Sequence, residues 1–395
     1  MPIKTLPGLT PDGQIYFDED MQVVEAMLPP LAGTTAHGPG LLETPAGTLL
    51  CCWFAGTFEG DTDVNIVVSR LEKGASRWTE PQMISTDNEF SNQNPSLFLA
   101  PSGEIWCMYT SQRGREPGKD NMQYTSVVKK QVSIDDGRTW GDPEVVLPEE
   151  GTFARQPVQV LSNGRWIYGL WLCSDSATGL AGDPSAFAIS DDEGKTWRRV
   201  DMPDSSGRVH PSLVELEAGH LLAIMRSREA DWIYRSESHD YGDTWTAPVS
   251  TPLPNNNSGI AVAKLASGRI AVAYNHNSAP ATYGKTGAWP ALRNPVSIAL
   301  SEDGGITFPF IRNIERGEGY VGDENKFNNR QYEYPCLLQA ADGMLHLAYA
   351  YQTRRGVKWV ALSEDDVMGA VRGEGTYNPT SGEGARLDSN ERQTV

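Results

Sequence analysis

An eight-residue pattern occurs four times in this chain of 395 residues and limits its possible folds more than any other feature. Each copy has Ser, Asp two residues later, Gly two after that, and then Thr and an aromatic residue. The copies are SIDDGRTW (133–140), SDDEGKTW (190–197), SHDYGDTW (238–245) and SEDGGITF (301–308). The Asp side chain can bond nearby backbone N–H groups and Gly tolerates positive φ, so each copy predicts a corner between two strands. Four copies cannot share one active site, which favours a structural role for Asp135, Asp192, Asp240 and Asp303.

A second, less regular repeat alternates with these boxes. Six segments each read as a short apolar strand, a turn closed by Gly, and an alternating apolar strand. They start at Gly38, Asn94, Gln156, His210, Ser258 and Tyr334, and their turn glycines are Gly47, Gly103, Gly164, Gly219, Gly268 and Gly343. Each segment is therefore predicted to be a β-hairpin.

The two repeats together predict the architecture. Degenerate boxes at Ser69 and Ser363 complete a set of six hairpins and six box positions. Four-stranded sheets repeated at this spacing are typical of propeller blades, so we expect an all-β, six-bladed β-propeller of four-stranded blades. The propeller should cover residues 31–370. The segment 1–30 is expected to supply a strand near Tyr16 that closes the ring, and 371–395 is a polar C-terminal tail.

Charge and cysteine usage exclude several classes of protein. The net charge is −18 and no run of Lys or Arg occurs, which argues against nucleic-acid or anionic-membrane partners. The five cysteines (Cys51, Cys52, Cys107, Cys173 and Cys336) lie in apolar strand-like runs without CxxC spacing, so we expect buried free thiols, no metal site and no cofactor. The chain begins without a signal-peptide pattern and has no apolar run of membrane-spanning length. A cytoplasmic location is therefore expected, or a secreted or periplasmic one if a signal has been removed.

Polar residues stand where the innermost strand of each predicted blade begins. In a propeller, the first residues of these strands face the mouth of the central channel, and convergent polar groups in a concave mouth are a candidate site. The set comprises His37, Asn94, Arg155, Gln156, His210, Asn257 and Tyr334.

The boxes and hairpins together resemble the sialidase superfamily with its Asp-box repeats, over roughly residues 30–365. The stretches around GPGLLETPAGTLLCCWF, NNNSGIAVAKLASGRIAVAYN and EYPCLLQAADGMLHLAYA are similar to its bacterial sialidase-like branch. This resemblance implies three arginines on a substrate carboxylate, an aspartate acid/base, and a tyrosine nucleophile assisted by a glutamate.

The matching positions in this chain are partly altered. The resemblance implies that Tyr334 is the nucleophile, with Tyr332 as an alternative, and that Arg226 is the second arginine. The first arginine is replaced at His37, and the assisting glutamate is replaced by His210. The third arginine could be Arg293, Arg330 or Arg354, and the acid could be Glu59, Asp61 or Asp63.

Three functions follow from these residues. The first is an exo-acting sialidase-like glycoside hydrolase on a terminal acidic sugar, without an ordinary arginine triad. In it Tyr334 attacks, His210 removes its proton, and Asp61 or Glu59 protonates the leaving oxygen. Substrate contacts are expected from Arg226, Arg155, Arg293, Arg354, Asn94, Asn257 and Asp63. The second is a lyase that acts on a uronate through His37, His210, Tyr334 and Arg226. The third is a non-catalytic propeller that binds a glycan or a protein.

Overall fold

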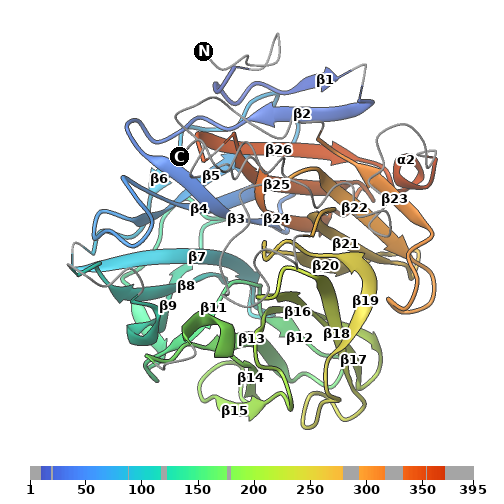
Figure 1. Ribbon diagram of the computed structural model, residues 1–395. Helices are drawn as coiled ribbons and strands as arrows, with labels where there is room; N and C mark the ends of the chain where they lie inside the picture. The colour runs from blue at the N-terminus through green and yellow to red at the C-terminus, as the bar shows by residue number, and fades with distance from the viewer. Residues whose placement is uncertain are drawn as a thin grey trace, which may run out of the picture.

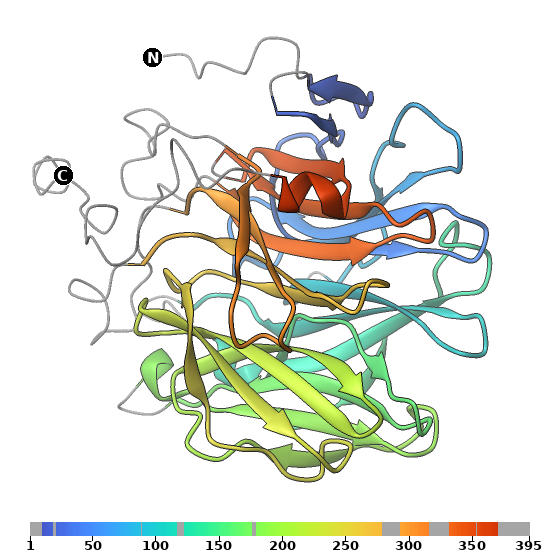
Figure 2. The same ribbon diagram turned by 90° about the vertical axis from the view of Figure 1, so that its right-hand side faces the viewer.

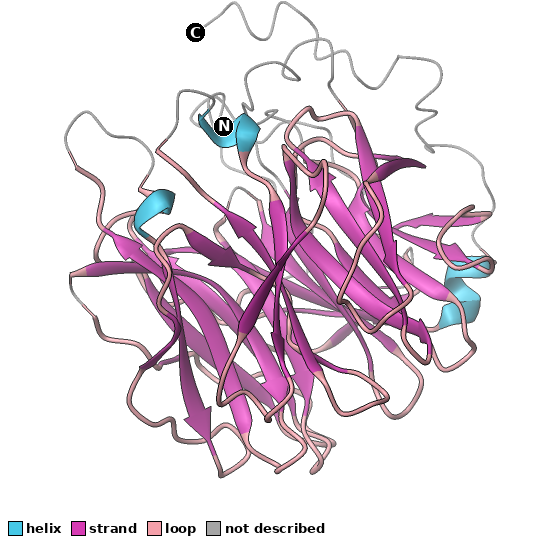
Figure 3. Cartoon of the chain, turned by 90° about the horizontal axis from the view of Figure 1, so that it is seen from below, coloured by secondary structure: helices cyan, strands magenta, loops and turns pink. Residues whose placement is uncertain are grey.

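The computed structural model describes residues 10–18, 21–87, 89–116, 122–175, 179–278, 293–315, 332–352 and 354–369. Six antiparallel sheets are arranged in a ring, with β3, β7, β16, β20 and β24 toward its middle (Figure 1). The described chain is nearly all strand, with only short helical segments (Figure 3). The predicted six-bladed β-propeller is confirmed.

Blades 1 and 2 each consist of four strands in chain order. Blade 1 contains β3 (Thr35–Glu43), β4 (Leu49–Gly56), β5 (Asn65–Leu71) and β6 (Gln82–Met83). Blade 2 contains β7 (Phe90–Leu99), β8 (Ile105–Arg113), β9 (Val127–Ser133) and β10 (Glu144–Leu147), with the 3-10 turn η1 (Gln123–Thr125) before β9.

Blade 3 differs from the others because its innermost strand is interrupted. The two pieces, β11 (Thr152–Ala154) and β12 (Gln159–Val160), both pair with β13 (Trp166–Leu172). The interruption contains Arg155 and Gln156, which sequence analysis placed at the channel mouth. The blade continues through η2 (Gly179–Gly182), β14 (Ser185–Ser190) and β15 (Arg198–Asp201).

Blades 4 and 5 each contain four strands. Blade 4 contains β16 (Arg208–Glu217), β17 (His220–Ser227), β18 (Trp232–Ser238) and β19 (Val249–Pro254). Blade 5 contains β20 (Ala261–Lys264), β21 (Ile270–Asn275), β22 (Val296–Ser301) and β23 (Phe310–Asn313).

Blade 6 closes the ring by joining the two ends of the described chain. It combines β24 (Tyr332–Gln339), β25 (Leu345–Tyr351) and β26 (Gly356–Leu362) with β2 (Val23–Met27) and β1 (Tyr16–Asp18). The strand that pairs with β26 is β2, and the expected segment around Tyr16 lies outside it as β1 (Figure 2). The reason is burial, since β2 presents an apolar side to the core whereas β1 is largely exposed. A short helix, α2 (Glu364–Met368), follows β26.

The boxes form the expected corners. In all four, the Asp carboxylate accepts a 2.8 Å hydrogen bond from the backbone N–H of the Thr four residues later. The six hairpin glycines all have φ between 80° and 92° apart from Gly219 at 78°, as their turns require. The segment at Ser363 is not a box. Its hydroxyl caps α2 by accepting from the Asp366 N–H.

The hydrophobic core lies between neighbouring blades. The larger clusters each combine strands of two adjacent blades, as with Trp106 on β8 and Trp166 on β13, whose rings lie 5.3 Å apart. All five cysteines are buried and free, as predicted. Within the described residues, no helix has the length and apolar character needed to cross a membrane.

Candidate active site

A strained backbone conformation recurs where the innermost strands begin. Asn94, His210, Asn257 and Tyr334 have φ between 49° and 57°, and Gly38 has the matching value of 60°. In β3, β7, β16 and β24 this residue sits in a β-bulge, at which the pairing register shifts. Bulges re-aim side chains, and left-handed φ costs a bulky residue on the order of 1–3 kcal/mol. Such strain on a Tyr and a His at one end of the propeller points to a functional site.

Tyr334 lies at the centre of this site and is surrounded by arginines. Its hydroxyl accepts a 2.6 Å hydrogen bond from Arg226 Nη1. The guanidinium carbons of Arg155 and Arg293 lie 4.9 and 5.3 Å from the centre of its ring. Burial disfavours the phenolate, but the positive charges of Arg226 and Arg293 outweigh this effect and lower the pKa of Tyr334 below its ordinary value. The phenol oxygen is therefore better prepared to act as a nucleophile or base than an isolated tyrosine.

Arg226 is fully buried and has no carboxylate partner among the described residues. Its Nε and Nη2 both donate to Asn257 Oδ1, at 2.9 and 2.7 Å. Burial lowers the pKa of Arg226 to about 9, and the neighbouring Arg228 and Arg293 contribute to the shift. A buried cation without a counter-ion is costly, and an anionic ligand would relieve that cost.

His210 is held in its neutral form. Its ring stacks on Trp171 at 4.0 Å, and its Nε2 lies 3.3 Å from Arg226 Nη1. Because arginine can only donate, Nε2 must accept and the ring proton must lie on Nδ1. Burial, followed by the charge of Arg226, lowers the pKa of His210 well below its ordinary value.

The predicted role of His210 as the base for Tyr334 is not supported by a hydrogen bond between the two residues in the described structure. The two rings meet edge to face, 5.5 Å apart. The lone pair of His210 Nε2 is directed at Arg226 instead. Ionisation of Tyr334 is thus favoured by the arginines around it.

Glu333, which sequence analysis did not single out, connects the remaining groups. It is fully buried and accepts from Arg293 Nη1 at 3.0 Å and from Arg354 Nε and Nη2 at 3.2 Å. His37 Nδ1 lies 3.5 Å from the same carboxylate, and the His37 ring contacts the Tyr334 ring with centres 4.3 Å apart. A sequence signal existed, because Glu333 and His37 each stand two residues before the proline of an innermost strand.

Of the three predicted acids, Glu59 reaches this cluster. Its carboxylate accepts a 2.6 Å hydrogen bond from Arg354 Nη1. Asp61 instead pairs with Arg115 at 3.1 Å, and Asp63 accepts from the Thr57 N–H at 2.9 Å within its own loop. The loop after β4 therefore directs one carboxylate toward Tyr334 and uses the other two elsewhere.

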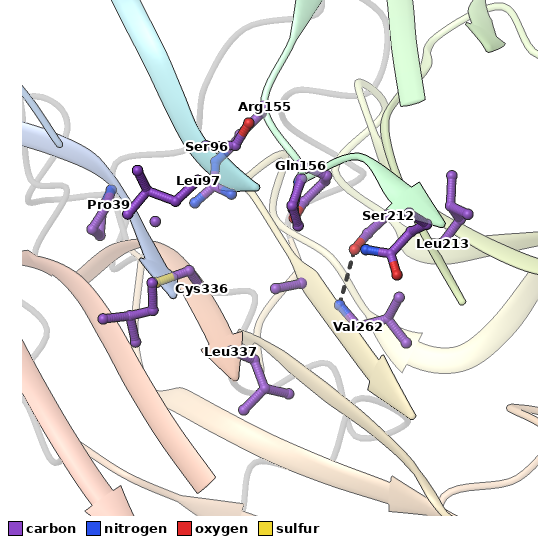
Figure 4. Close-up of a pocket in the computed structure, with 15 residues that line it drawn as sticks. Pro39, Ser96, Leu97, Arg155, Gln156, Ser212, Leu213, Val262, Cys336 and Leu337 are labelled. Carbon is purple, nitrogen blue, oxygen red and sulfur yellow. Dashed lines mark hydrogen bonds between the residues drawn. The ribbon is translucent and has the colours of Figure 1, made fainter. Parts of the chain in front are cut away.

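The other predicted residues form the floor and edge of the site. Arg155 Nη2 donates to the Tyr334 backbone carbonyl at 2.7 Å. Arg155 also lines a pocket between the innermost strands, together with Ser96, Gln156, Ser212 and Cys336 among others (Figure 4). Asn94 lies against Gly38 of the adjacent blade. Arg330, one alternative for the third arginine, lies outside the described residues.

Comparisons with known proteins agree with this fold. Residues 47–347 match the model of the BNR repeat-like domain family. A curated sialidase of Bacteroides fragilis is 23% identical over 363 residues, which cover 81% of this chain and 61% of the relative. The chain thus spans about three fifths of the length of that relative.

Several solved structures have a similar fold. A Hadza microbial sialidase superposes with a TM-score of 0.67 at 18% identity, covering 84% of this chain and 66% of its own. A Dyadobacter fermentans protein of unknown function also gives 0.67, at 17% identity, with coverages of 86% and 97%. The intramolecular trans-sialidase of Ruminococcus gnavus gives 0.63 at 15% identity, with coverages of 84% and 95%. Because the family match spans most of the propeller, the chain belongs to the BNR repeat-like domain family.

Proposed function

We propose that this protein is a sialidase-like glycoside hydrolase that removes a terminal acidic sugar. The observation that carries the proposal is Arg226, a buried cation without a carboxylate partner in the described structure, bonded to the hydroxyl of Tyr334. A substrate carboxylate would supply the missing negative charge and would place the sugar next to the phenol oxygen. The sialidases among the relatives and structural neighbours support this reaction class.

The charges around Tyr334 favour an anionic ligand even though the whole chain is acidic. Four guanidinium groups, those of Arg155, Arg226, Arg293 and Arg354, are set against two carboxylates, Glu59 and Glu333. Arg226 and Arg293 both contact Asn257, through its side chain and its backbone carbonyl. We assign the carboxylate to these two arginines, because Arg354 is already paired with both glutamates.

Arg354 does not replace the missing first arginine as a ligand of the substrate carboxylate, because both glutamates already pair with it. Where the family resemblance implies an arginine, blade 1 has His37, and Arg354 approaches the same Glu333 carboxylate from the loop between β25 and β26. The altered arginine set supports an acidic sugar other than an ordinary sialic acid.

The chemistry follows from the position of each group. The Tyr334 phenolate attacks the anomeric carbon as the glycosidic bond breaks, and the leaving oxygen takes a proton from Glu59, which has to be in its carboxylic acid form for this step. Water then attacks the glycosyl–tyrosine intermediate and gives its proton to Glu59, which releases the sugar and regenerates the phenol oxygen. Arg226 and Arg293 stabilise the phenolate before attack and after release.

A second candidate is a lyase that acts on a uronate. It is favoured by His37, which contacts the Tyr334 ring, and by the neutral His210 next to Arg226. In this reaction the Tyr334 phenolate removes the proton next to the carboxylate and gives it to the leaving oxygen as the glycosidic bond breaks, which leaves the sugar unsaturated. The arginines would stabilise the negative charge on the carboxylate as the proton leaves.

A glycan screen in ¹⁸O-labelled water, followed by mass spectrometry, tests the proposal and separates the two reactions. The panel contains sialosides, other terminal acidic sugars and uronate polymers, and the free sugars serve as controls for spontaneous exchange. We expect a released acidic sugar that carries ¹⁸O beyond the exchange control. An unlabelled, unsaturated product would replace hydrolysis with elimination. Binding without turnover on the whole panel would refute both and favour a glycan-binding propeller.

A further inference from the structure

Blade 4 carries a second cluster of functional side chains, far from Tyr334. His220 stands at the start of β17, whereas Arg226 is near the end of the same strand. Six residues of extended strand separate the two ends by roughly 20 Å. The cluster therefore lies at the box end of the propeller, opposite the candidate active site.

Strand pairing explains how the cluster forms. β17 and β18 are neighbours (Figure 1), and Leu221 pairs with Ser238, which brings His220 and His239 opposite one another. Glu237 lies near the end of β18 and His239 follows directly after the strand, and His239 Nε2 comes within 3.5 Å of the Glu237 carboxylate. The spacing along the sequence gave no metal motif because the ligands come from two strands.

The atoms have the geometry of three metal ligands. His220 Nε2 lies 2.9 Å from Glu237 Oε2, and His239 Nε2 lies 3.5 Å from the same oxygen. One ligand atom from each residue falls within 4.8 Å of the others. Ligands about 2.05 Å from a tetrahedral ion are roughly 3.3 Å apart, so small side-chain shifts would seat an ion among them. The two imidazole rings are stacked with their centres 4.2 Å apart, which keeps both Nε2 atoms on one side.

Other blades have a simpler arrangement at this end. Arg165 pairs with Asp191 and Asp243, and Arg269 pairs with Glu302 and Glu364. In blade 4, Arg235 already forms a salt bridge with Glu237 Oε1. His220 follows the turn glycine Gly219 as Arg165 and Arg269 follow Gly164 and Gly268, so blade 4 has a histidine at the position of those arginines. The Arg235–Glu237 pair instead repeats the spacing of the Arg70–Glu72 pair of blade 1.

We propose that His220, Glu237 and His239 bind a divalent transition-metal ion such as Zn²⁺. Two imidazoles and one carboxylate suit Zn²⁺, Cu²⁺ or Ni²⁺ and are poor ligands for Mg²⁺ or Ca²⁺. The His239 side chain is 66% exposed, so the ion can enter from solvent and the fourth position is open to water. The ion would tie the start of β17 to the end of β18 and stabilise this corner of blade 4.

Zinc titration of the full chain tests the site. The protein is prepared without a histidine tag, stripped with a chelator and titrated with Zn²⁺ at pH 7.5 by calorimetry. We expect one site, and a Tm that rises with Zn²⁺ concentration. His239→Ala and His220→Ala should each weaken binding at least tenfold, whereas Glu302→Gln, which removes an exposed carboxylate of blade 5, should bind like the wild type.

Two further readouts keep the test specific. The Tm of each metal-free variant shows whether the substitution alone disturbs folding, and the exposed His239 should be replaceable without such an effect. Cu²⁺ bound to the wild type should give an electron paramagnetic resonance spectrum with two nitrogen ligands, reduced to one in His239→Ala. The absence of a 1:1 site, or equal binding by the wild type and both histidine variants, would overturn the proposal.

Discussion

Replacing Glu333 by Gln tests whether this internal carboxylate stabilises the fold by balancing the positive charge of the site. Glu333 is fully buried and is the shared partner of Arg293 and Arg354. Glutamine has nearly the same shape and still offers one oxygen, so Glu333→Gln removes a charge without creating a cavity. Arg293 would then have no carboxylate partner among the described residues, and Arg354 would retain Glu59 alone.

The size of the effect follows from three hydrogen bonds. Arg293 donates one and Arg354 donates two to Glu333, at 3.0 to 3.2 Å. A bond to a charged acceptor is worth about 1 kcal/mol more than one to a neutral acceptor, which gives about 3 kcal/mol for the three bonds. Breaking a buried ion pair typically costs about 3–5 kcal/mol. We therefore expect Glu333→Gln to lower the free energy of unfolding by about 3–5 kcal/mol.

Urea unfolding followed by tryptophan fluorescence measures this loss. Glu302→Gln is the matched control, because it makes the same chemical change in an exposed pair with Arg269, where about 0–1 kcal/mol is expected. Millimolar carboxylates that bind the freed arginines should restore part of the stability of Glu333→Gln and none in the control. If both variants unfold at the same urea concentration, the reasoning about Glu333 is refuted.

Three further substitutions test other parts of the structure. Asp303→Ala removes the bonds to the Thr307 N–H and hydroxyl, and should lower unfolding free energy by about 1–2 kcal/mol while leaving turnover unchanged, as measured by urea titration and activity. Lys358→Met leaves Glu25 and Glu315 buried without their cation. It should lower the free energy of unfolding by about 3–5 kcal/mol, measured by the same urea titration. Adding Glu25→Gln to it should recover part of that loss, and no recovery would contradict the ion-pair account. Burial raises the pKa of Asp183 to about 6, above its value of 3.8 when unfolded, so its stabilising contribution is full below pH 4 and is lost as pH rises through 6. The wild-type minus Asp183→Asn difference in unfolding free energy should therefore fall by about 3 kcal/mol from pH 4 to pH 7, and a constant difference would contradict the assigned shift.

The repeats in the sequence predicted the architecture because each repeat encodes its own local structure. Within one box, the Asp carboxylate accepts from the N–H and hydroxyl of the Thr, and the Ser hydroxyl accepts from the N–H of the Gly. Each hairpin glycine lies in a turn that requires positive φ. Aligning the hairpins also placed His210, Tyr334 and Arg226 at one end of the ring, although they come from two different blades.

Contacts between segments far apart in the chain could not be predicted from the sequence. Glu333 shares with His37 its position before a proline, but only the folded ring brings Arg293 and Arg354 to it. His220 and His239 meet through the register of two strands. The ring-closing strand was predicted near Tyr16, whereas burial of β2 decides the pairing with β26.

The most direct test of the central claim is to measure kcat of the Tyr334→Phe variant on an acidic glycoside that the wild type cleaves. Phenylalanine keeps the ring that contacts His37 and removes only the oxygen bonded to Arg226. The account predicts a loss in kcat of roughly 1,000-fold or more, with the wild-type fold retained by circular dichroism. A variant that folds and turns over the same substrate like the wild type would contradict the assignment of Tyr334 and its arginines as the active site.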